Sequence, residues 1–125
     1  MKAKDYGFKA FQKMPESQNK HFSKFHESMF ESPAWIGLSI HSRYLYIEMT
    51  RKFTGRNEQD IMFTQKEGIK IMGKNTFTAC IKQLIQYGFI EYVERNSYNC
   101  LPNIYGFSTK WHLFIPEKKS KKKLD

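Results

Sequence analysis

The chain has few of the residues that usually build a metal site or a covalent scaffold. It contains only two cysteines among its 125 residues, and no CxxC pair. The sequence therefore indicates neither a zinc site nor a disulfide framework. Its four histidines are scattered, and no HExxH motif, paired carboxylates or phosphate-binding glycine loop occurs. We expect a protein that is not an enzyme and that has no cofactor and no metal site.

Long apolar runs are also missing. No segment approaches the roughly 20 apolar residues that a membrane-spanning helix needs. The lysine-rich beginning lacks the apolar segment of a signal peptide. The sequence thus predicts a cytoplasmic protein. The run from Lys118 to Lys123 has no adjacent apolar anchor, which argues against binding to a membrane surface.

Acidic residues are scarce relative to basic ones. Twelve Asp and Glu stand against 21 Lys and Arg, for a net charge of +9. Residues 32–116 hold ten of the bases and six of the acids, so this region is basic (+4) without help from the lysine-rich end. Such a balance favours polyanionic partners, of which nucleic acid is the leading class.

The organisation that we predict is one folded domain with a segment on each side. Residues 1–31 form an N-terminal arm with a short amphipathic helix over Gln18–Glu31, where Phe22, Phe25 and Met29 recur at helical spacing. Residues 32–116 form the domain, because 40% apolar and 16% aromatic residues can build a core. Residues 117–125 form a disordered, lysine-rich tail.

The first half of the domain carries two helix-start signals. Ser32 and Pro33 are a cap and a first helical residue, which predict a single turn. Ser39 then caps a helix from Ile40 to Phe53, followed by a short strand at 61–63. We assign the buried side of that helix to four residues at or near helical spacing: Tyr44, Leu45, Ile47 and Met49.

The most informative stretch begins at Thr64. With Glu67 three residues later, it forms a capping-box pattern that starts a short helix, which Gly73 ends. A second helix, Asn75–Tyr87, follows after a tight turn and ends at Gly88, a residue that easily takes the left-handed conformation.

A β-hairpin pattern follows. The residues alternate over 89–95, residues 96–103 read as a hairpin tip, and residues 104–109 return as the second strand. Helix, tight turn, helix and hairpin predict an α+β fold, a winged helix-turn-helix with a three-helix core and a β-hairpin wing. That shape suits the major groove of DNA.

The second helix has a polar face that suits base edges. Asn and Gln can pair with adenine, Lys reaches guanine acceptors, and Thr or Ala can touch a thymine methyl group. No acidic residue lies between Gly68 and Ile90. The first N–H groups of the helix could hold a phosphate. An ordinary solvent-exposed face is the alternative. The residues that we assign to DNA on this helix are Lys74, Asn75, Thr76, Thr78, Lys82 and Gln86, beside Ala79.

Two other groups are candidates for phosphate contact. Lys66 and Lys70 lie on the preceding helix, where surface solubility is the equally simple explanation. The hairpin could act as a wing along the DNA backbone or equally be an exposed loop. Its candidate contacts are Arg95, Ser97, Tyr98 and Asn99.

Several segments resemble one protein family. They are Ser32-Pro33-Ala34-Trp35, Leu38 to Tyr46, Lys74-Asn75-Thr76-Phe77, Leu84 to Ile90, Pro102 to Tyr105, Phe107-Ser108 and Lys110-Trp111. Over residues 30–112 the chain resembles winged helix-turn-helix proteins of plasmids, phages and integrative elements of Gram-positive bacteria. The resemblance implies a recognition helix that starts at Lys74, Asn75 and Thr76. One departure is the turn Met72-Gly73, which lacks the usual serine cap and predicts an unusual angle between the two helices.

The function that we predict is site-specific, non-catalytic binding of double-stranded DNA in a mobile genetic element. The resemblance implies conjugative transfer, as a relaxosome accessory, or replication initiation at an origin. Transcriptional regulation of the element is one alternative. A protein-interaction module that recruits a relaxase, helicase or polymerase is another. A homodimer on DNA would predict inverted half-sites about one helical turn apart.

Overall fold

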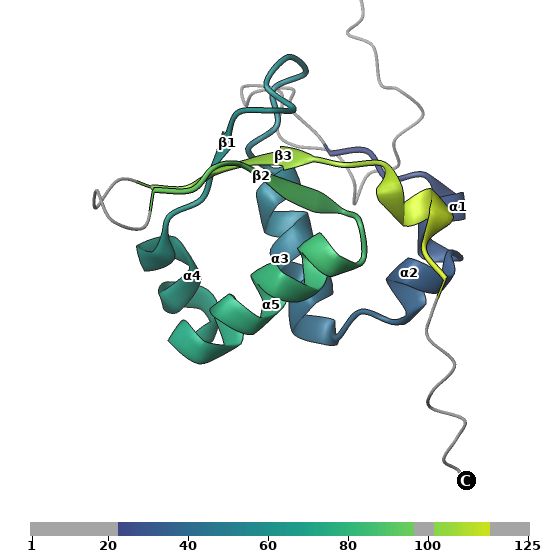
Figure 1. Cartoon of the computed structure of the whole chain (residues 1–125), viewed down its shortest axis with the longest axis horizontal. Helices are drawn as coiled ribbons and strands as arrows, with labels where there is room; N and C mark the ends of the chain where they lie inside the picture. Colours follow the sequence, from purple (N-terminus) through teal and green to yellow (C-terminus); the bar gives the residue numbers. More distant parts are fainter. Residues whose placement is uncertain (1–22, 97–101, 116–125) are drawn as a thin grey trace, which may run out of the picture.

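The computed structural model describes residues 23–96 and 102–115, which form a mixed α+β structure (Figure 1). The sheet lies above helices α3, α4 and α5 in that view, with α1 and α2 at one end of the molecule. In chain order the elements are α1 Glu27–Phe30, α2 Pro33–Ile36, α3 Ile40–Thr50, β1 Ile61–Met62, α4 Gln65–Met72, α5 Lys74–Gln86, β2 Ile90–Glu94, β3 Ile104–Phe107 and a 3₁₀ helix, η2, Lys110–Leu113.

The sheet is antiparallel with the strand order β1-β3-β2. The central strand β3 places Tyr105 opposite Ile61 on one side and opposite Tyr92 on the other. The register shifts after Tyr92, which marks a bulge just before the hairpin tip. Residues 97–101 of the tip lie outside the described part of the chain.

The three helix starts predicted from a capping residue are confirmed. The Ser32 hydroxyl accepts from the Trp35 N–H at 3.1 Å, and the Ser39 hydroxyl caps α3 in the same way. At α4 the Thr64 hydroxyl accepts from the Glu67 N–H at 3.0 Å, while the Glu67 carboxylate accepts from the Thr64 N–H at 2.8 Å. This is the reciprocal capping box that the pattern predicted.

Two glycines end helices as predicted. Gly73 has φ +85° and separates α4 from α5, so α5 begins without a side-chain cap. Gly88 has φ +89° and follows α5, and a side chain there would meet the backbone of Lys110 and Trp111. Both positions need a residue that tolerates positive φ.

Two helices are shorter than predicted. The N-terminal one covers only α1, because His26 is its N-cap and accepts from the Ser28 N–H at 3.2 Å. Residues 23–26 are not helical, and residues 18–22 lie outside the described part. Helix α3 ends at Thr50 rather than at Phe53, because the Asn57 side chain closes the following turn. Its amide accepts from the Thr54 N–H at 2.7 Å and donates to a backbone carbonyl at 2.9 Å.

The predicted buried side of α3 is partly wrong. Tyr44 and Ile47 are 45% and 36% exposed, whereas Ser42 and Tyr46 are buried together with Leu45 and Met49. The Tyr46 ring packs against Trp35, Phe89 and Phe107 with ring centroids 5.3–6.1 Å apart. The four buried residues share one helical face. Burial also raises the pKa of Tyr46 to about 12, so its phenol stays neutral.

The chain after β3 closes one end of the core. Trp111 and Phe114 pack against the core, whereas Leu113 and Ile115 are 82% and 77% exposed. Trp111 stacks on Phe89 with centroids 5.8 Å apart, and Phe114 stacks on Tyr87 at 4.3 Å. Within the two described ranges, no helix has the length and apolar character needed to cross a membrane.

Candidate nucleic-acid interface

Helix α5 has the two faces that its sequence predicts. Phe77, Cys80, Ile81 and Leu84 are buried against the rest of the core. The opposite side is open to solvent and carries no acidic residue. Its exposed members follow one another at helical spacing along the whole length of α5: Lys74, Asn75, Thr78, Ala79, Lys82 and Gln86. We call this row the α5 stripe.

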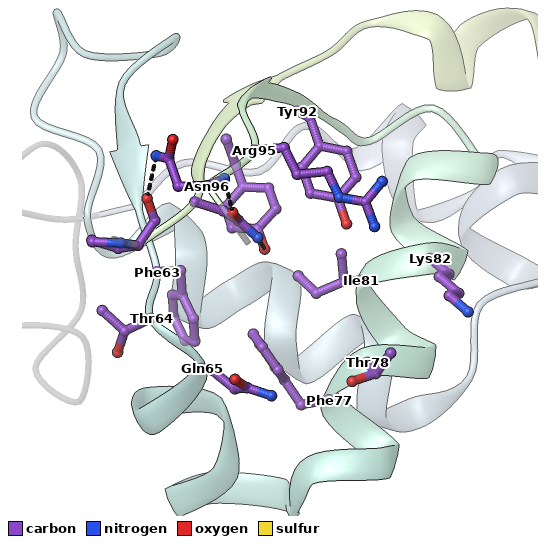
Figure 2. Close-up of a pocket in the computed structure, with 13 residues that line it drawn as sticks. Phe63, Thr64, Gln65, Phe77, Thr78, Ile81, Lys82, Tyr92, Arg95 and Asn96 are labelled. Carbon is purple, nitrogen blue, oxygen red and sulfur yellow. Dashed lines mark hydrogen bonds between the residues drawn. The ribbon is translucent and has the colours of Figure 1, made fainter. Parts of the chain in front are cut away.

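A hollow of about 440 Å³ lies between α5, the start of α4 and the base of the hairpin (Figure 2). Three parts of the chain build it: residues 63–65, the middle of α5, and the facing ends of β2 and β3 with Asn96 and Pro102. Its apolar walls come mainly from Phe63, Phe77, Ile81 and Tyr92. We call this hollow the wing groove.

The charged side chains of the wing groove are both basic. Among the described residues that line it, Lys82 and Arg95 carry charge and no carboxylate is present. The Arg95 guanidinium lies over the Tyr92 ring, 4.6 Å from the ring centroid. Figure 2 shows Arg95 extended across Tyr92 toward α5, while Lys82 reaches outward at the rim. The cation–π contact holds the Arg95 charge on the α5 side of the hairpin.

Hydrogen bonds fix the base of the hairpin at the edge of the groove. The Asn96 N–H donates to the Asn103 side chain at 2.7 Å, and the Asn96 amide donates to the Pro102 carbonyl at 2.8 Å. Burial raises the pKa of Tyr105, whose hydroxyl accepts from the Asn103 amide at 3.5 Å, so this hydroxyl adds no negative charge. The groove therefore offers amides, hydroxyls and two cations to a ligand.

The acidic residue in the first turn of α4 is already paired. The Glu67 carboxylate accepts from Lys52 Nζ at 2.6 Å as well as from the Thr64 N–H. Partial burial raises the pKa of Glu67, but the hydrogen bonds from Lys52 and Thr64 lower it, and the net pKa lies below its ordinary value of 4.5. The start of α4 holds the carboxylate in place, and the positive charge of Lys52 balances its negative charge.

A second hollow, of about 400 Å³, lies on the other side of the α5 stripe. It is lined by Asn75 and Thr76 from α5 and by His41 and Ser42 from the start of α3. The predicted site residues thus divide between two hollows. Thr78, Lys82 and Arg95 line the wing groove, and Asn75 and Thr76 line this one.

The remaining predicted site residues lie elsewhere. Lys66 and Lys70 are exposed on α4, while Lys74 and Gln86 are exposed near the two ends of α5, and these four line neither hollow. The hairpin-tip residues Ser97, Tyr98 and Asn99 lie outside the described residues.

The sequence analysis missed a hydrogen-bond network that joins α3 to α5. The side-chain amide oxygen of Gln83 (Oε1) accepts from the Ser42 hydroxyl at 2.6 Å and from the Ser39 N–H at 3.0 Å. Ser42 is fully buried. The contact fixes α5 against the start of α3, and nothing local could reveal it because its partners are 41 and 44 residues apart. Gln65, Asn96 and Asn103 were missed as well. The two Asn residues are the first and last of the predicted hairpin tip, and that position was the signal available for them.

Comparisons of the chain with family models, with curated proteins and with solved structures found no match. In residues 23–96 and 102–115, no three His, Cys, Asp or Glu side chains come together as a metal ion would require.

Proposed function

We propose that the chain is a winged helix-turn-helix domain that binds double-stranded DNA at specific sites and has no catalytic activity of its own. One observation carries this proposal. The exposed stripe of α5 is polar and free of acids, and it runs beside a groove whose two charged lining residues are Lys82 and Arg95. A surface of this kind suits a polyanion that also presents hydrogen-bonding edges.

The arrangement of the elements supports the fold assignment. A helix (α3), a short strand (β1), two helices joined by one residue (α4 and α5) and a hairpin (β2 and β3) follow in the order of a winged helix. The sheet order β1-β3-β2 brings the first strand beside the second strand of the hairpin. In this proposal α5 is the recognition helix and the hairpin is the wing.

The dimensions of α5 fit the major groove. Its 13 residues span about 20 Å at 1.5 Å per residue, and a major groove about 12 Å wide admits one helix. Asn75 and Gln86 supply amides for adenine, Lys82 reaches guanine acceptors, and Thr78 offers a methyl group. The Thr78 hydroxyl donates to the Lys74 carbonyl at 3.0 Å, so it is available to DNA mainly as an acceptor.

Affinity would come from charge around the stripe. The exposed basic residues Lys66, Lys70 and Lys74 extend the positively charged surface from α5 onto α4. Arg95 adds a positive charge on the side of the wing. Four to eight phosphate contacts would give a slope of log affinity against log salt concentration of about −4 to −7.

A salt titration tests the proposal. Fluorescence anisotropy with a labelled random-sequence duplex of about 25 base pairs should give that slope. Lys74→Gln, which removes one of the proposed phosphate contacts, should then make the slope shallower by about 0.9. The matched control is Lys110→Gln, which removes an exposed charge on η2, away from both hollows. A flat salt response, or no duplex binding, would refute the proposal.

A second test addresses sequence recognition. Asn75→Ala with Lys82→Ala should lower the preference for a duplex enriched by selection over a random duplex. Unchanged affinity and preference in this variant would instead favour a surface for a protein partner such as a relaxase, helicase or polymerase.

The biological context that we propose follows from the family resemblance, namely DNA processing in a mobile element by transfer or by replication at an origin. Footprinting on the origin and promoter regions of the host element separates these roles. Protection within an origin supports DNA processing, and protection of a promoter alone supports transcriptional control.

A further inference from the structure

Helix α3 carries an exposed apolar row that the core does not use. Ile40, Tyr44 and Ile47 are 77%, 45% and 36% exposed, and Ile36, at the end of α2, is 63% exposed. Ile40, Tyr44 and Ile47 lie on the side of α3 opposite Leu45 and Met49, which are buried in the core. Ile36 is next to α3, since its carbonyl accepts from Arg43 at 3.1 Å. None of the four lines the wing groove or the hollow beside it. We call them the α3 row.

The α3 row is large for an unused surface. Together its side chains expose roughly 400 Å², a patch size that on monomeric proteins often has a function. Its members on the helix are spaced by four and then three residues, from Ile40 to Tyr44 to Ile47. This is the spacing of the apolar seam between two paired helices.

The charges beside the row select a partner. Arg43 lies along one edge of the row and Glu48 along the other. Among the described residues, Glu48 forms an ion pair with the exposed Arg51 at 3.1 Å, and its hydrogen bond with the Tyr44 hydroxyl raises the pKa of Tyr44. If two α3 helices pack side by side in parallel about a two-fold axis, Arg43 of each copy faces Glu48 of the other copy. The five-residue offset matches that of the charged positions flanking the seam of a parallel coiled pair.

We infer that the α3 row is the contact surface for a second copy of this chain. A two-fold axis uses the same patch on both copies, and here one patch supplies both the apolar seam and the matching charges. The row is about half of the roughly 800 Å² per partner in a standard interface. The dimer is therefore weak, and it forms reversibly as the protein concentration rises. This inference does not depend on DNA binding.

Analytical ultracentrifugation of the full chain tests the inference, from about 5 to 500 µM in moderate salt. The wild-type chain should shift from monomer to dimer over this range. Ile40→Glu with Ile47→Glu should raise the dissociation constant at least about tenfold, because a dimer of this variant would bury four carboxylates, two from each copy. The matched control is Leu113→Glu, which changes an apolar side chain that is 82% exposed on η2 and should leave the equilibrium unchanged.

A charge exchange tests the geometry. Arg43→Glu alone places like charges across the interface, and so does Glu48→Arg alone. Neither variant should dimerise, but an equimolar mixture of the two should, since both contacts then join opposite charges. Thermal melts monitor the fold of each variant, because Arg43 also donates to the Ile36 carbonyl at 3.1 Å.

Three results would overturn the inference. The first is a wild-type chain that stays monomeric up to 500 µM, which would mean that another part of the same chain or a different partner covers the row. The second is a dimer that tolerates both glutamates in the row. The third is a dimer that the Leu113→Glu control disrupts equally. The glutamate variants decide the matter even if Arg43→Glu fails to fold.

Discussion

Replacing Gly68 by alanine should destabilise the protein, although the same change stabilises most helices. Gly68 is buried in the middle of α4, and a methyl group built there would overlap the ring of Phe77 on α5. Packing holds the ring in place, since Phe77 is only 5% exposed and stacks on Phe63 with centroids 5.9 Å apart. The absence of a side chain at Gly68 is what allows α4 and α5 to approach so closely.

Two opposing effects set the size of the change in the free energy of unfolding. Alanine gains about 0.5–1 kcal/mol over glycine within a helix, and forcing extra volume into a packed core costs about 1–3 kcal/mol. Because carbon atoms need about 3.5–4.0 Å of separation, we expect the upper part of the second range. The net loss in the free energy of unfolding is then about 1–2.5 kcal/mol, which lowers the Tm by roughly 4–20 °C.

Urea unfolding followed by circular dichroism measures this loss, with Lys70→Ala as the control on the exposed side of the same helix. A double-mutant cycle isolates the cause. Phe77→Leu should destabilise the protein by opening a cavity, and the methyl group of Gly68→Ala should partly fill that cavity. The double variant should therefore be more stable than the sum of the two changes predicts, by about 1 kcal/mol. If Gly68→Ala is stabilising, or if the two changes are additive, the packing argument is wrong.

Three further predictions follow from contacts around the proposed interface. Gln83→Leu should lower the free energy of unfolding by about 1–3 kcal/mol in urea melts, because it leaves the buried Ser42 hydroxyl without its acceptor. Adding Ser42→Ala should recover part of that loss, and no recovery would contradict the explanation. The lowered pKa of Glu67 means that its carboxylate stabilises the fold above pH 4.5 and that this contribution is lost as the pH falls through the folded-state pKa. The stability advantage over Glu67→Gln, measured by thermal melts at several pH values, should therefore shrink below pH 4.5, and a constant difference would refute it. If the chain binds DNA as proposed, Tyr92→Leu should weaken duplex binding about two- to fivefold without changing the salt slope, since Arg95 keeps its charge but loses the stacking contact; a change of slope in anisotropy titrations would argue against this role of the ring.

Much of the local structure could be predicted because its causes lie within a few residues. Ser32, Ser39 and Thr64 each cap the N–H three positions along the chain, so the start of a helix is visible in a four-residue window. Gly73 and Gly88 end helices through their own backbone freedom. The two faces of α5 were also predictable, since its apolar residues recur every three or four positions.

The choice of the buried face of α3 could not be predicted in this way. Tyr44 and Tyr46 are the same residue type, so hydropathy cannot tell which of them is buried. The sequence analysis placed Tyr44 on the buried side, and that prediction was wrong. Tyr46 is buried because the rings of Trp35 and Phe89 are there to receive it. The position of those rings depends on how α2 and the chain after α5 pack.

For the candidate site, the sequence by itself determined the chemistry, and the tertiary structure decided the grouping. The polar, acid-free character of the α5 stripe is a property of thirteen consecutive residues, and a helical period is enough to separate it from the core. The wing groove joins residues near positions 64, 80 and 100, and the Gln83 contact spans 41 residues. Such groupings need the whole chain to fold, because a short-range pattern fixes which way a side chain points along its own helix but not what it meets there.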